Sequence, residues 1–404
     1  MVTMTNFQNY KHFFPIFKNN PDLVYLDSGA TTLKPQIVLD KMMEYYTKYS
    51  ANIHRGIYGI SEMATEEYEK SREKLRKFIG GQDGQVIFTG GTTEAINLVA
   101  RGWGDKNLVE GEEIVVTEME HHSNLIPWQE LVKRKNLRLK FMTVNNYELR
   151  VTNFGKVIDK KTRLLAITQV SNVTGSVNPI KKIIEEARKI NPKIVVVVDG
   201  AQAVAHRPVD LQDLGCDFYA FSGHKMYGPT GIGVLWAKEE RYKEMEPIKF
   251  GGGMIAEVGL LESTFSSGVE KFEGGTPPIA EAIGMGVAVD FIEKIGMTKI
   301  KKHEEELTAY LRFKLEKVAG IKTFSAWQSG IVAMEIAGVH PHDVAQILAD
   351  RGVCVRAGHH CAMPLHKALG VEATTRVSLG IYNTKEDIDK LVEGLEAVKK
   401  IFNI

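Results

Sequence analysis

Residues 193–229 read KIVVVVDGAQAVAHRPVDLQDLGCDFYAFSGHKMYGP. Two apolar runs in this stretch, Lys193–Asp199 and Asp217–Ser222, each lead into a polar residue and a glycine. Short continuous apolar runs of this kind are typical of strands buried on both faces of a parallel sheet. Ligands of such sheets bind at the carboxyl ends of the strands. We therefore expect Asp199 and Lys225, which follow these two strands, to lie at one site.

The same pattern extends on both sides of this stretch, from about residue 80 to residue 240. Helical patterns such as Thr93–Trp103 and Lys181–Lys189 lie between the apolar runs, and this alternation predicts an α/β fold with a mostly parallel sheet. The further candidate strands are Gln85–Thr89, Glu113–Thr117, Arg163–Gln169 and Gly231–Ala237.

The pattern changes after Pro277-Pro278, where long helices alternate with a few short strands. This change predicts a large domain over residues 16–278 and a smaller α+β domain formed by residues 1–15 and 279–404. The helices expected in the smaller domain are Ile279–Ile295, Thr298–Val318, Pro341–Arg351 and Lys385–Phe402, and the strands are Ile331–Ile336, Val353–Arg356 and Thr375–Leu379.

Composition excludes several classes of function. The 404 residues carry 51 Lys plus Arg against 50 Asp plus Glu, a balance that gives no electrostatic reason to expect nucleic acid or an anionic membrane as partner. Three cysteines cannot form a disulfide framework, which indicates a reducing compartment. The first residues lack the apolar region of a signal peptide. We therefore expect a cytoplasmic protein.

Glycines and polar side chains follow the strand ends. In Phe88-Thr89-Gly90-Gly91-Thr92-Thr93 the glycines would let the backbone approach a phosphate, although a tight turn with a threonine helix cap explains the same pattern. Asp199 would suit a protonated pyridine nitrogen, or would simply cap the next helix. Lys225 is placed to form a Schiff base with an aldehyde cofactor, with Ser222 and His224 near its phosphate.

Two further motifs combine histidine with other reactive residues. His121-His122 follows a strand, where an imidazole would stack on a flat ring, bind a metal, or only fill the core. Cys361 lies in a loop marked by Gly358 and Pro364, so we expect an accessible thiol beside the positive charges of Arg356, His359 and His360. A metal site of His359, His360, Cys361 and His366 is the alternative, but these intervals do not match structural zinc sites, and we expect no metal.

Together these residues resemble the class V aminotransferase family of pyridoxal-phosphate enzymes and, within it, the SufS-type (group II) cysteine desulfurases. The resemblance extends from Tyr25-Leu26-Asp27-Ser28-Gly29-Ala30 to Tyr382-Asn383-Thr384, and it is carried most specifically by FSGHKMYGPTGIG (221–233) and RAGHHCAMPL (356–365). It implies the type I fold of pyridoxal-phosphate (PLP)-dependent transferases, in a homodimer.

The resemblance also implies a role for each matching residue. Lys225 would hold the cofactor as a Schiff base and later move protons, while Asp199 would pair with the pyridine nitrogen. Gln202 would contact the phenolic oxygen and His121 would stack on the ring. Thr92, Thr93, Ser222 and His224 would hold the phosphate, and Thr276 would reach the phosphate of the neighbouring subunit; Asn172, Arg356 and Arg376 would bind the substrate.

The implied activity is conversion of L-cysteine to L-alanine, with the sulfur carried as a persulfide on Cys361 towards iron–sulfur cluster assembly. The sulfur acceptor would be a protein of SufU or SufE type. His340-Pro341-His342-Asp343 resembles desulfurases with a SufU-like acceptor, but a turn before a helix is the simpler interpretation. Selenocysteine lyase activity at the same site is one alternative, and a non-enzymatic metal-binding module built on the histidine pairs is another.

Overall fold

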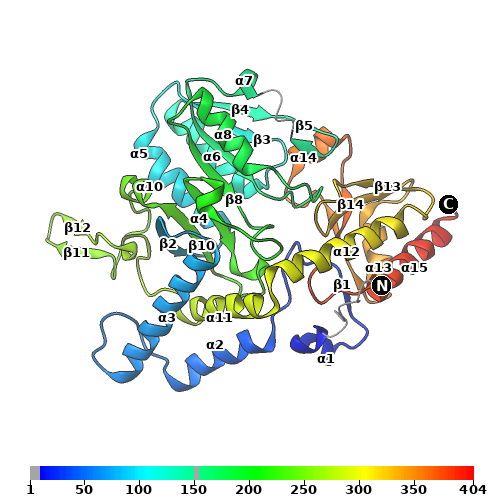
Figure 1. Cartoon of the computed structure of the whole chain (residues 1–404), viewed down its shortest axis with the longest axis horizontal. Helices are drawn as coiled ribbons and strands as arrows, with labels where there is room; N and C mark the ends of the chain where they lie inside the picture. The colour runs from blue at the N-terminus through cyan, green and yellow to red at the C-terminus, as the bar shows by residue number, and fades with distance from the viewer. Residues whose placement is uncertain (1–9, 150–153) are drawn as a thin grey trace.

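The central feature of the computed structural model, which describes residues 10–149 and 154–404, is a seven-stranded sheet (Figure 1). Only β10 runs antiparallel to its neighbours, so the predicted mostly parallel sheet is confirmed. In spatial order the strands are β2 (Gly84–Thr89), β10 (Gly233–Lys238), β9 (Phe218–Ser222), β8 (Val195–Asp199), β7 (Thr162–Thr168), β3 (Glu113–Thr117) and β4 (Arg138–Met142).

The sequence analysis missed strand β4. Its pattern RLKFM is mostly charged or exposed, because β4 lies at the edge of the sheet and pairs only with β3 among the described strands. An edge strand is not buried on both faces and so lacks the continuous apolar run that marked the other strands. The predicted helix at Thr93–Trp103 is also modified: it is α-helical over α4 (Thr92–Leu98) and continues as a π-helical turn over Val99–Gly104.

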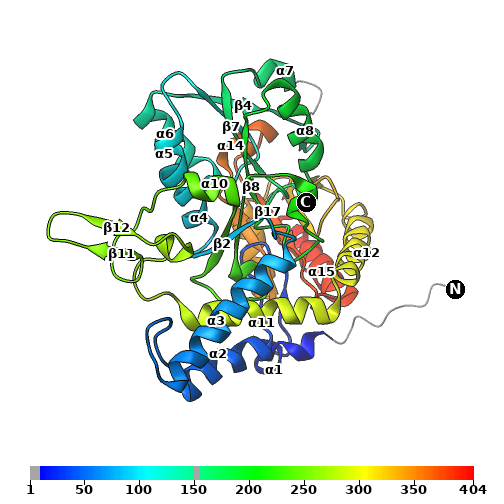
Figure 2. The same ribbon diagram turned by 60° about the vertical axis from the view of Figure 1, so that its left-hand side comes forward.

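Both faces of the sheet are buried. Along β8, Val196 and Val198 pack into one hydrophobic core, while Val195 and Val197 pack into a second core on the opposite face. Alternate side chains of a strand point to opposite faces, so a strand covered on both sides must be apolar throughout. The first core is covered by α3 (Gly59–Phe78), α8 (Ile180–Ile190) and α11 (Ile279–Ile295), and the second by α4, α6 (Ile126–Lys135) and α10 (Glu239–Glu244) (Figure 2).

The C-terminal part has its own antiparallel sheet and its own hydrophobic core, as predicted for an α+β unit. Helices α12, α13 and α15 pack in contact with one another or with this sheet. The predicted strand at Val353–Arg356 is divided into two. The elements are α12 (Met297–Leu315), β13 (Ile321–Phe324), β14 (Ile331–Ile336), α13 (Pro341–Ala349), β15 (Val353–Cys354), β16 (Arg356–Gly358), α14 (Met363–Leu369), β17 (Thr374–Ser378) and α15 (Lys385–Phe402).

The N-terminal segment lies against the C-terminal part. Lys11 forms an ion pair with Asp387 at 2.6 Å, and β1 (Val24–Tyr25) pairs in parallel with β15. Residues 1–9 of the predicted smaller domain lie outside the described residues. The boundaries of the two domains stay a prediction. The remaining elements are α1 (Pro15–Asn19), α2 (Gln36–Lys48), α5 (Asp105–Asn107), β5 (Val144–Asn145), β6 (Glu148–Leu149), α7 (Phe154–Val157) and α9 (Leu211–Leu214).

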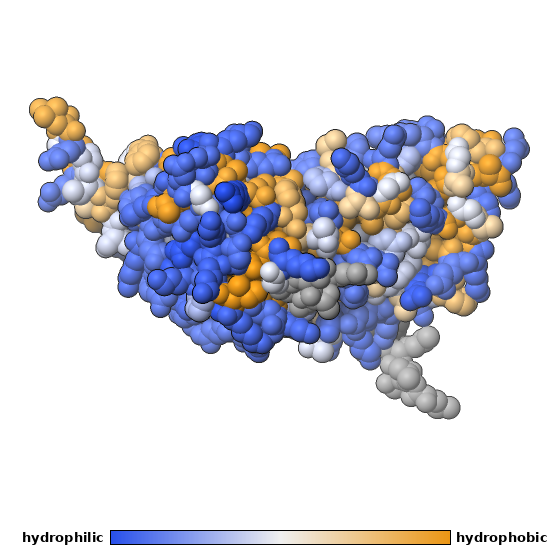
Figure 3. Space-filling view, turned by 90° about the horizontal axis from the view of Figure 1, so that it is seen from above, coloured by the Kyte–Doolittle hydropathy of each residue, from blue (hydrophilic) through white to orange (hydrophobic). Residues whose placement is uncertain are grey.

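A hairpin of β11 (Ile255–Val258) and β12 (Ser263–Phe265) projects from the large part (Figure 1). Its tip carries Leu260 and Leu261, both fully exposed, and is coloured as hydrophobic at the left-hand end of Figure 3. None of the helices in the described ranges has the length and apolar character needed to cross a membrane.

Candidate active site

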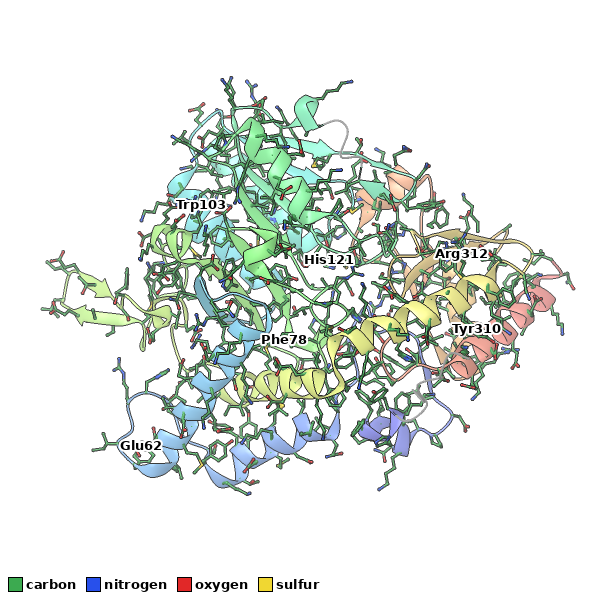
Figure 4. All side chains as sticks on the ribbon, viewed as in Figure 1. Glu62, Phe78, Trp103, His121, Tyr310 and Arg312 are labelled. Carbon is green, nitrogen blue, oxygen red and sulfur yellow. The ribbon has the colours of Figure 1, made fainter. Side chains whose placement is uncertain are left out.

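A cavity of about 270 Å³ lies at the carboxyl ends of β8 and β9, between the large and the C-terminal parts. His121, labelled in Figure 4, marks it near the middle of the molecule. The cavity brings together every predicted site residue except Thr276: Thr92, Thr93, His121, Asn172, Asp199, Gln202, Ser222, His224, Lys225, Arg356, Cys361 and Arg376.

Asp199 and Lys225 supply opposite charges to this cavity. Asp199 ends β8, and its Oδ1 accepts the N–H of Ala201 at 2.9 Å. Burial raises the pKa of the Asp199 carboxyl, with Lys225 acting in the opposite direction. Burial lowers the pKa of Lys225 to about 8, and its amine has no hydrogen-bond or ion-pair partner within residues 10–149 and 154–404. A lysine that loses its proton so close to neutral pH is a competent nucleophile.

Hydroxyl groups line one end of the cavity. The Thr92 N–H donates to Ser222 Oγ at 2.8 Å, and the two hydroxyls of these residues lie 2.7 Å apart. Thr93 Oγ1 lies 2.7 Å from Ser123 Oγ. Gly91 has φ of +147°, and a Cβ there would lie 3.3 Å from Ser222 Oγ, so the strand-to-helix turn needs glycine at this position. Hydroxyls and a helix start together suit an anionic group.

The His121 ring is neutral. Burial, reinforced by the charge of Lys225, lowers the pKa of His121 to about 3. Its Nδ1 accepts the Ser123 N–H at 3.1 Å, so the ring proton is on Nε2. His224 is also neutral, because burial first and then the charges of Lys225 and Lys34 lower its pKa to about 4. A neutral imidazole can stack on a flat ring, and its one N–H can donate a hydrogen bond to an anionic group.

Glu120, directly before His121, was not assigned a role by the sequence analysis. Its carboxyl group is buried and accepts hydrogen bonds from the Thr117 hydroxyl at 2.6 Å, the Asn124 amide at 2.6 Å and the Thr168 N–H at 3.0 Å. Burial raises the pKa of Glu120 to about 8. These bonds tie the end of β3 to the end of β7 and so fix the backbone that carries His121. An acidic residue just after a buried strand was the available signal.

Asp27 organises the two arginines and was not assigned a role from sequence, although it lies within the quoted Tyr25–Ala30 segment. Arg376 Nη2 donates to Asp27 Oδ1 at 2.9 Å, and Arg356 Nε donates to Asp27 Oδ2 at 3.1 Å. Arg376 also donates from Nη1 to the backbone oxygen of Asn172, but its buried Nε has no partner among the described residues.

The loop that carries Cys361 is held against the large part by His122. The His122 N–H donates to the Cys361 carbonyl at 2.7 Å, and the Met363 N–H donates to His122 Nε2 at 3.1 Å. Cys361 is exposed, as predicted, and has φ of +55° in the left-handed region. The expected positive charge on His360 is wrong, because burial and the neighbouring Arg376 lower its pKa to about 2.

Thr276 lies apart from this site. It lines a second cavity of about 390 Å³ together with the His54-Arg55 segment, Gly252 and Gly253. Two of the suggested metal ligands already have another partner: His360 Nε2 and His366 Nε2 both contact the Thr374 hydroxyl, at 2.9 and 3.0 Å. Across the two described ranges, no group of three or more His, Cys, Asp or Glu side chains is arranged to hold a metal ion.

Comparison with known proteins places this arrangement in a family. Residues 24–391 match the family described as aminotransferase class-V. The chain belongs to this family. It is 49% identical to a probable cysteine desulfurase of Halalkalibacterium halodurans, over 98% of this chain and 99% of the relative. It is 47% identical to a probable cysteine desulfurase of Staphylococcus epidermidis, over 96% of each chain.

Solved structures of class V relatives have the same fold. The crystal structure of the cysteine desulfurase CsdA from Escherichia coli superposes with a TM-score of 0.92 at 36% identity and covers 98% of this chain and 99% of the relative. The apo structure of a cysteine desulfurase from Thermococcus onnurineus gives a TM-score of 0.92 at 38% identity, over 97% and 98% of the two chains. The predicted type I fold of PLP-dependent transferases is thus confirmed.

Proposed function

We infer that this protein is a PLP-dependent cysteine desulfurase that converts L-cysteine to L-alanine and carries the released sulfur as a persulfide on Cys361. The single observation that supports this best is the shared cavity of Lys225 and Cys361: a buried, unpaired lysine and an exposed cysteine face the same space. An aminotransferase of the same family needs the lysine but not the cysteine. The proposal agrees with the names of the full-length relatives.

The lining of the cavity fits PLP. Lys225 would hold its aldehyde as a Schiff base, Asp199 would pair with the ring nitrogen, and His121 would stack on the ring. The phosphate would be held by Thr92, Thr93, Ser222 and His224, whose hydroxyls and neutral imidazole line the cavity. Bound there, PLP supplies an electron sink for the substrate carbon. Gln202 would contact the phenolic oxygen, and its amide already donates to the Gly29 carbonyl at 2.8 Å.

The arginines suit the carboxylate of an amino acid. Arg376 lines the cavity and is only 2% exposed, so its guanidinium is placed to bind the carboxylate of the substrate. Arg356 is half-exposed and shares Asp27 with Arg376. Asn172 donates its amide to the His360 carbonyl at 2.7 Å and thereby joins the substrate site to the cysteine loop.

Two side chains of the protein do the chemistry. The amine of Lys225, with a pKa of about 8, takes and returns a proton at the substrate Cα near neutral pH. The thiolate of Cys361 attacks the substrate sulfur: an S–S bond forms, the C–S bond breaks, and its electron pair stays on the carbon, which is protonated to give alanine. Exposure of Cys361 leaves the resulting persulfide open to a second protein.

We also propose the homodimer, with Thr276 of each subunit reaching the phosphate site of the other. The position of Thr276 in a separate cavity supports this, since it does not serve its own subunit's cavity. Within each subunit, we propose that residues 16–278 form the large domain and that residues 1–15 and 279–404 form the smaller domain.

The sulfur acceptor is proposed to be a protein of SufU or SufE type that serves iron–sulfur cluster assembly. The His340-Pro341-His342 segment does not distinguish the two. His340 Nδ1 accepts the His342 N–H at 3.3 Å and caps α13, which supports the interpretation of this segment as a turn before a helix.

The decisive experiment measures L-alanine formed from L-cysteine by the cofactor-loaded protein with a thiol reductant present. We expect repeated turnover in the wild type and none in Cys361→Ala. Cys354→Ala is the matched control, because Cys354 is half-buried and does not line the cavity. Unchanged alanine formation by Cys361→Ala would contradict the persulfide role of Cys361. If Cys361→Ala loses turnover of L-cysteine but keeps turnover of selenocysteine, the result would favour selenocysteine lyase activity.

A further inference from the structure

His122 is the residue of the His121-His122 motif that the proposed chemistry does not use. His121 lines the active-site cavity, whereas His122 is directed to the loop that carries Cys361. The main-chain N–H of His122 donates to the Cys361 carbonyl at 2.7 Å, and the Met363 N–H donates to His122 Nε2 at 3.1 Å. One residue of the large part therefore holds the loop backbone both at the cysteine and two positions after it.

The backbone of this loop needs such support. His360 has φ of +51° and Cys361 has φ of +55°, so two consecutive residues with a Cβ lie in the left-handed region. This conformation costs free energy and persists only where the surrounding structure holds it. The large part supplies hydrogen bonds to the loop from His122 and from the Asn172 amide, which donates to the His360 carbonyl at 2.7 Å. His122 thus supports the conformation in which Cys361 lines the cavity.

The bond from Met363 requires a neutral imidazole. A main-chain N–H only donates, so His122 Nε2 must offer a lone pair and the ring proton is on Nδ1. Burial, and then the nearby His359, lowers the pKa of His122 below its ordinary value, which keeps this lone pair free at neutral pH. Met363 is the first residue of α14, and its N–H has no partner inside the helix. The imidazole satisfies this N–H.

The two adjacent histidines face different parts of the site. His121 lines the cavity, and its Nδ1 accepts the Ser123 N–H at 3.1 Å, while His122 holds the Cys361 loop. One short segment after β3 therefore fixes both the ring proposed to stack on the cofactor and the loop of the proposed nucleophile. A nucleophile displaced by about 1 Å from its productive position can lose a large part of its rate.

We propose that His122 is a positioning residue for sulfur transfer: its imidazole accepts the Met363 N–H and keeps Cys361 where its thiolate attacks the substrate sulfur. This inference rests on the proposed function. Within residues 10–149 and 154–404, His122 has no hydrogen bond with Lys225 or Arg376, which are proposed to bind the amino acid. Loss of the imidazole acceptor therefore slows the transfer of sulfur and leaves the binding of the amino acid unchanged.

Two variants separate the acceptor from the rest of the side chain. His122→Phe keeps a flat ring but has no acceptor. His122→Gln places an amide near the position of Nε2, and its oxygen can accept the Met363 N–H. Both variants keep the main-chain bond to the Cys361 carbonyl. The visible absorbance of each PLP-loaded variant, compared with that of the wild type, reports whether the protein folds and holds its cofactor.

The kinetic test is a single turnover. An excess of the PLP-loaded protein is mixed with L-cysteine without a reductant; the early change in visible absorbance follows binding, and quenched samples give the rate of alanine formation. We expect His122→Phe to form alanine about tenfold more slowly, the contribution of one hydrogen bond, with unchanged affinity for L-cysteine and for L-alanine. His122→Gln should form alanine within about twofold of the wild-type rate, because the hydrogen bond is restored.

Hydrogen exchange followed by mass spectrometry reports on the loop independently of the chemistry. The peptide that contains Met363 should exchange faster in His122→Phe than in the wild type, because its N–H loses a partner, and His122→Gln should restore the slower exchange.

Three results would overturn the proposal: alanine formation by His122→Phe at the wild-type rate, alanine formation by His122→Gln as slow as by His122→Phe, or an equal loss of amino-acid affinity and of rate in His122→Phe. The last result would assign His122 a general structural role. Failure of the proposed function is distinguished by the wild type, which would then form no alanine, while hydrogen exchange would still show whether His122 holds the loop.

Discussion

Replacing Asp27 by Asn tests whether the arginine pair depends on a single carboxylate. Asp27 binds both Arg356 and Arg376, and the Arg376 side chain is only 2% exposed. Removing one partner of a buried ion pair costs about 3–5 kcal/mol, because the remaining charge is left uncompensated. The bond to Arg356 adds at most about 1 kcal/mol, since that side chain is 50% exposed. We therefore expect Asp27→Asn to lose about 3 kcal/mol or more.

The assay is urea denaturation of the PLP-loaded protein at one fixed protein concentration. With a urea dependence of about 3 kcal/mol/M, this loss lowers the midpoint by about 1 M. The matched control is Asp290→Asn, because Asp290 pairs with Lys74 at 2.5 Å and both side chains are more than 40% exposed. The control should move the midpoint by less than about 0.3 M. Equal midpoints for the two variants would refute the assignment of Arg376 as a buried charge held by Asp27. Asp27→Asn should also raise KM for L-cysteine, since Arg376 loses its anchor.

Three further predictions concern Lys225, Glu120 and Thr276. In cofactor-free protein, Lys225→Met should be more stable than the wild type at pH 7 by up to about 3 kcal/mol, because the pKa of Lys225 is about 8 in the folded state and 10.5 in the unfolded state. This difference in stability should shrink as the pH rises from 8 to 10.5. A Lys225→Met variant that is less stable than the wild type at pH 7 would contradict the prediction. Glu120 has a pKa of about 8 in the folded state, above its ordinary 4.5, and therefore binds a proton more tightly in the folded protein. The denaturation midpoint of the wild type should therefore fall relative to that of Glu120→Gln as the pH rises from 4.5 to 8. A difference between the two midpoints that does not change with pH would be the contrary result. Thr276→Val should weaken PLP retention about tenfold by equilibrium dialysis, and unchanged retention would count against its role at the neighbouring subunit's phosphate.

The sequence by itself determined the architecture of the large part and the identity of most residues in the cavity. Strands such as β8 are buried on both faces, so their residues are apolar throughout. A continuous apolar run of this kind can be recognised from a single sequence. Because the carboxyl ends of parallel strands meet at one edge of the sheet, Asp199 and Lys225 had to lie close together once the strands were identified. The edge strand β4 lacks this signal and was missed.

Only the tertiary structure decided how the C-terminal loop completes the site. Asp27 and Arg376 are far apart in sequence, and neither apolar periodicity nor spacing indicates that one carboxylate binds two arginines. The charge of His360 was also predicted wrongly, because proximity to Cys361 in sequence suggested a cation, whereas burial and Arg376 keep the ring neutral. Protonation depends on the groups that surround a side chain in space, and those groups come from segments that only folding brings together.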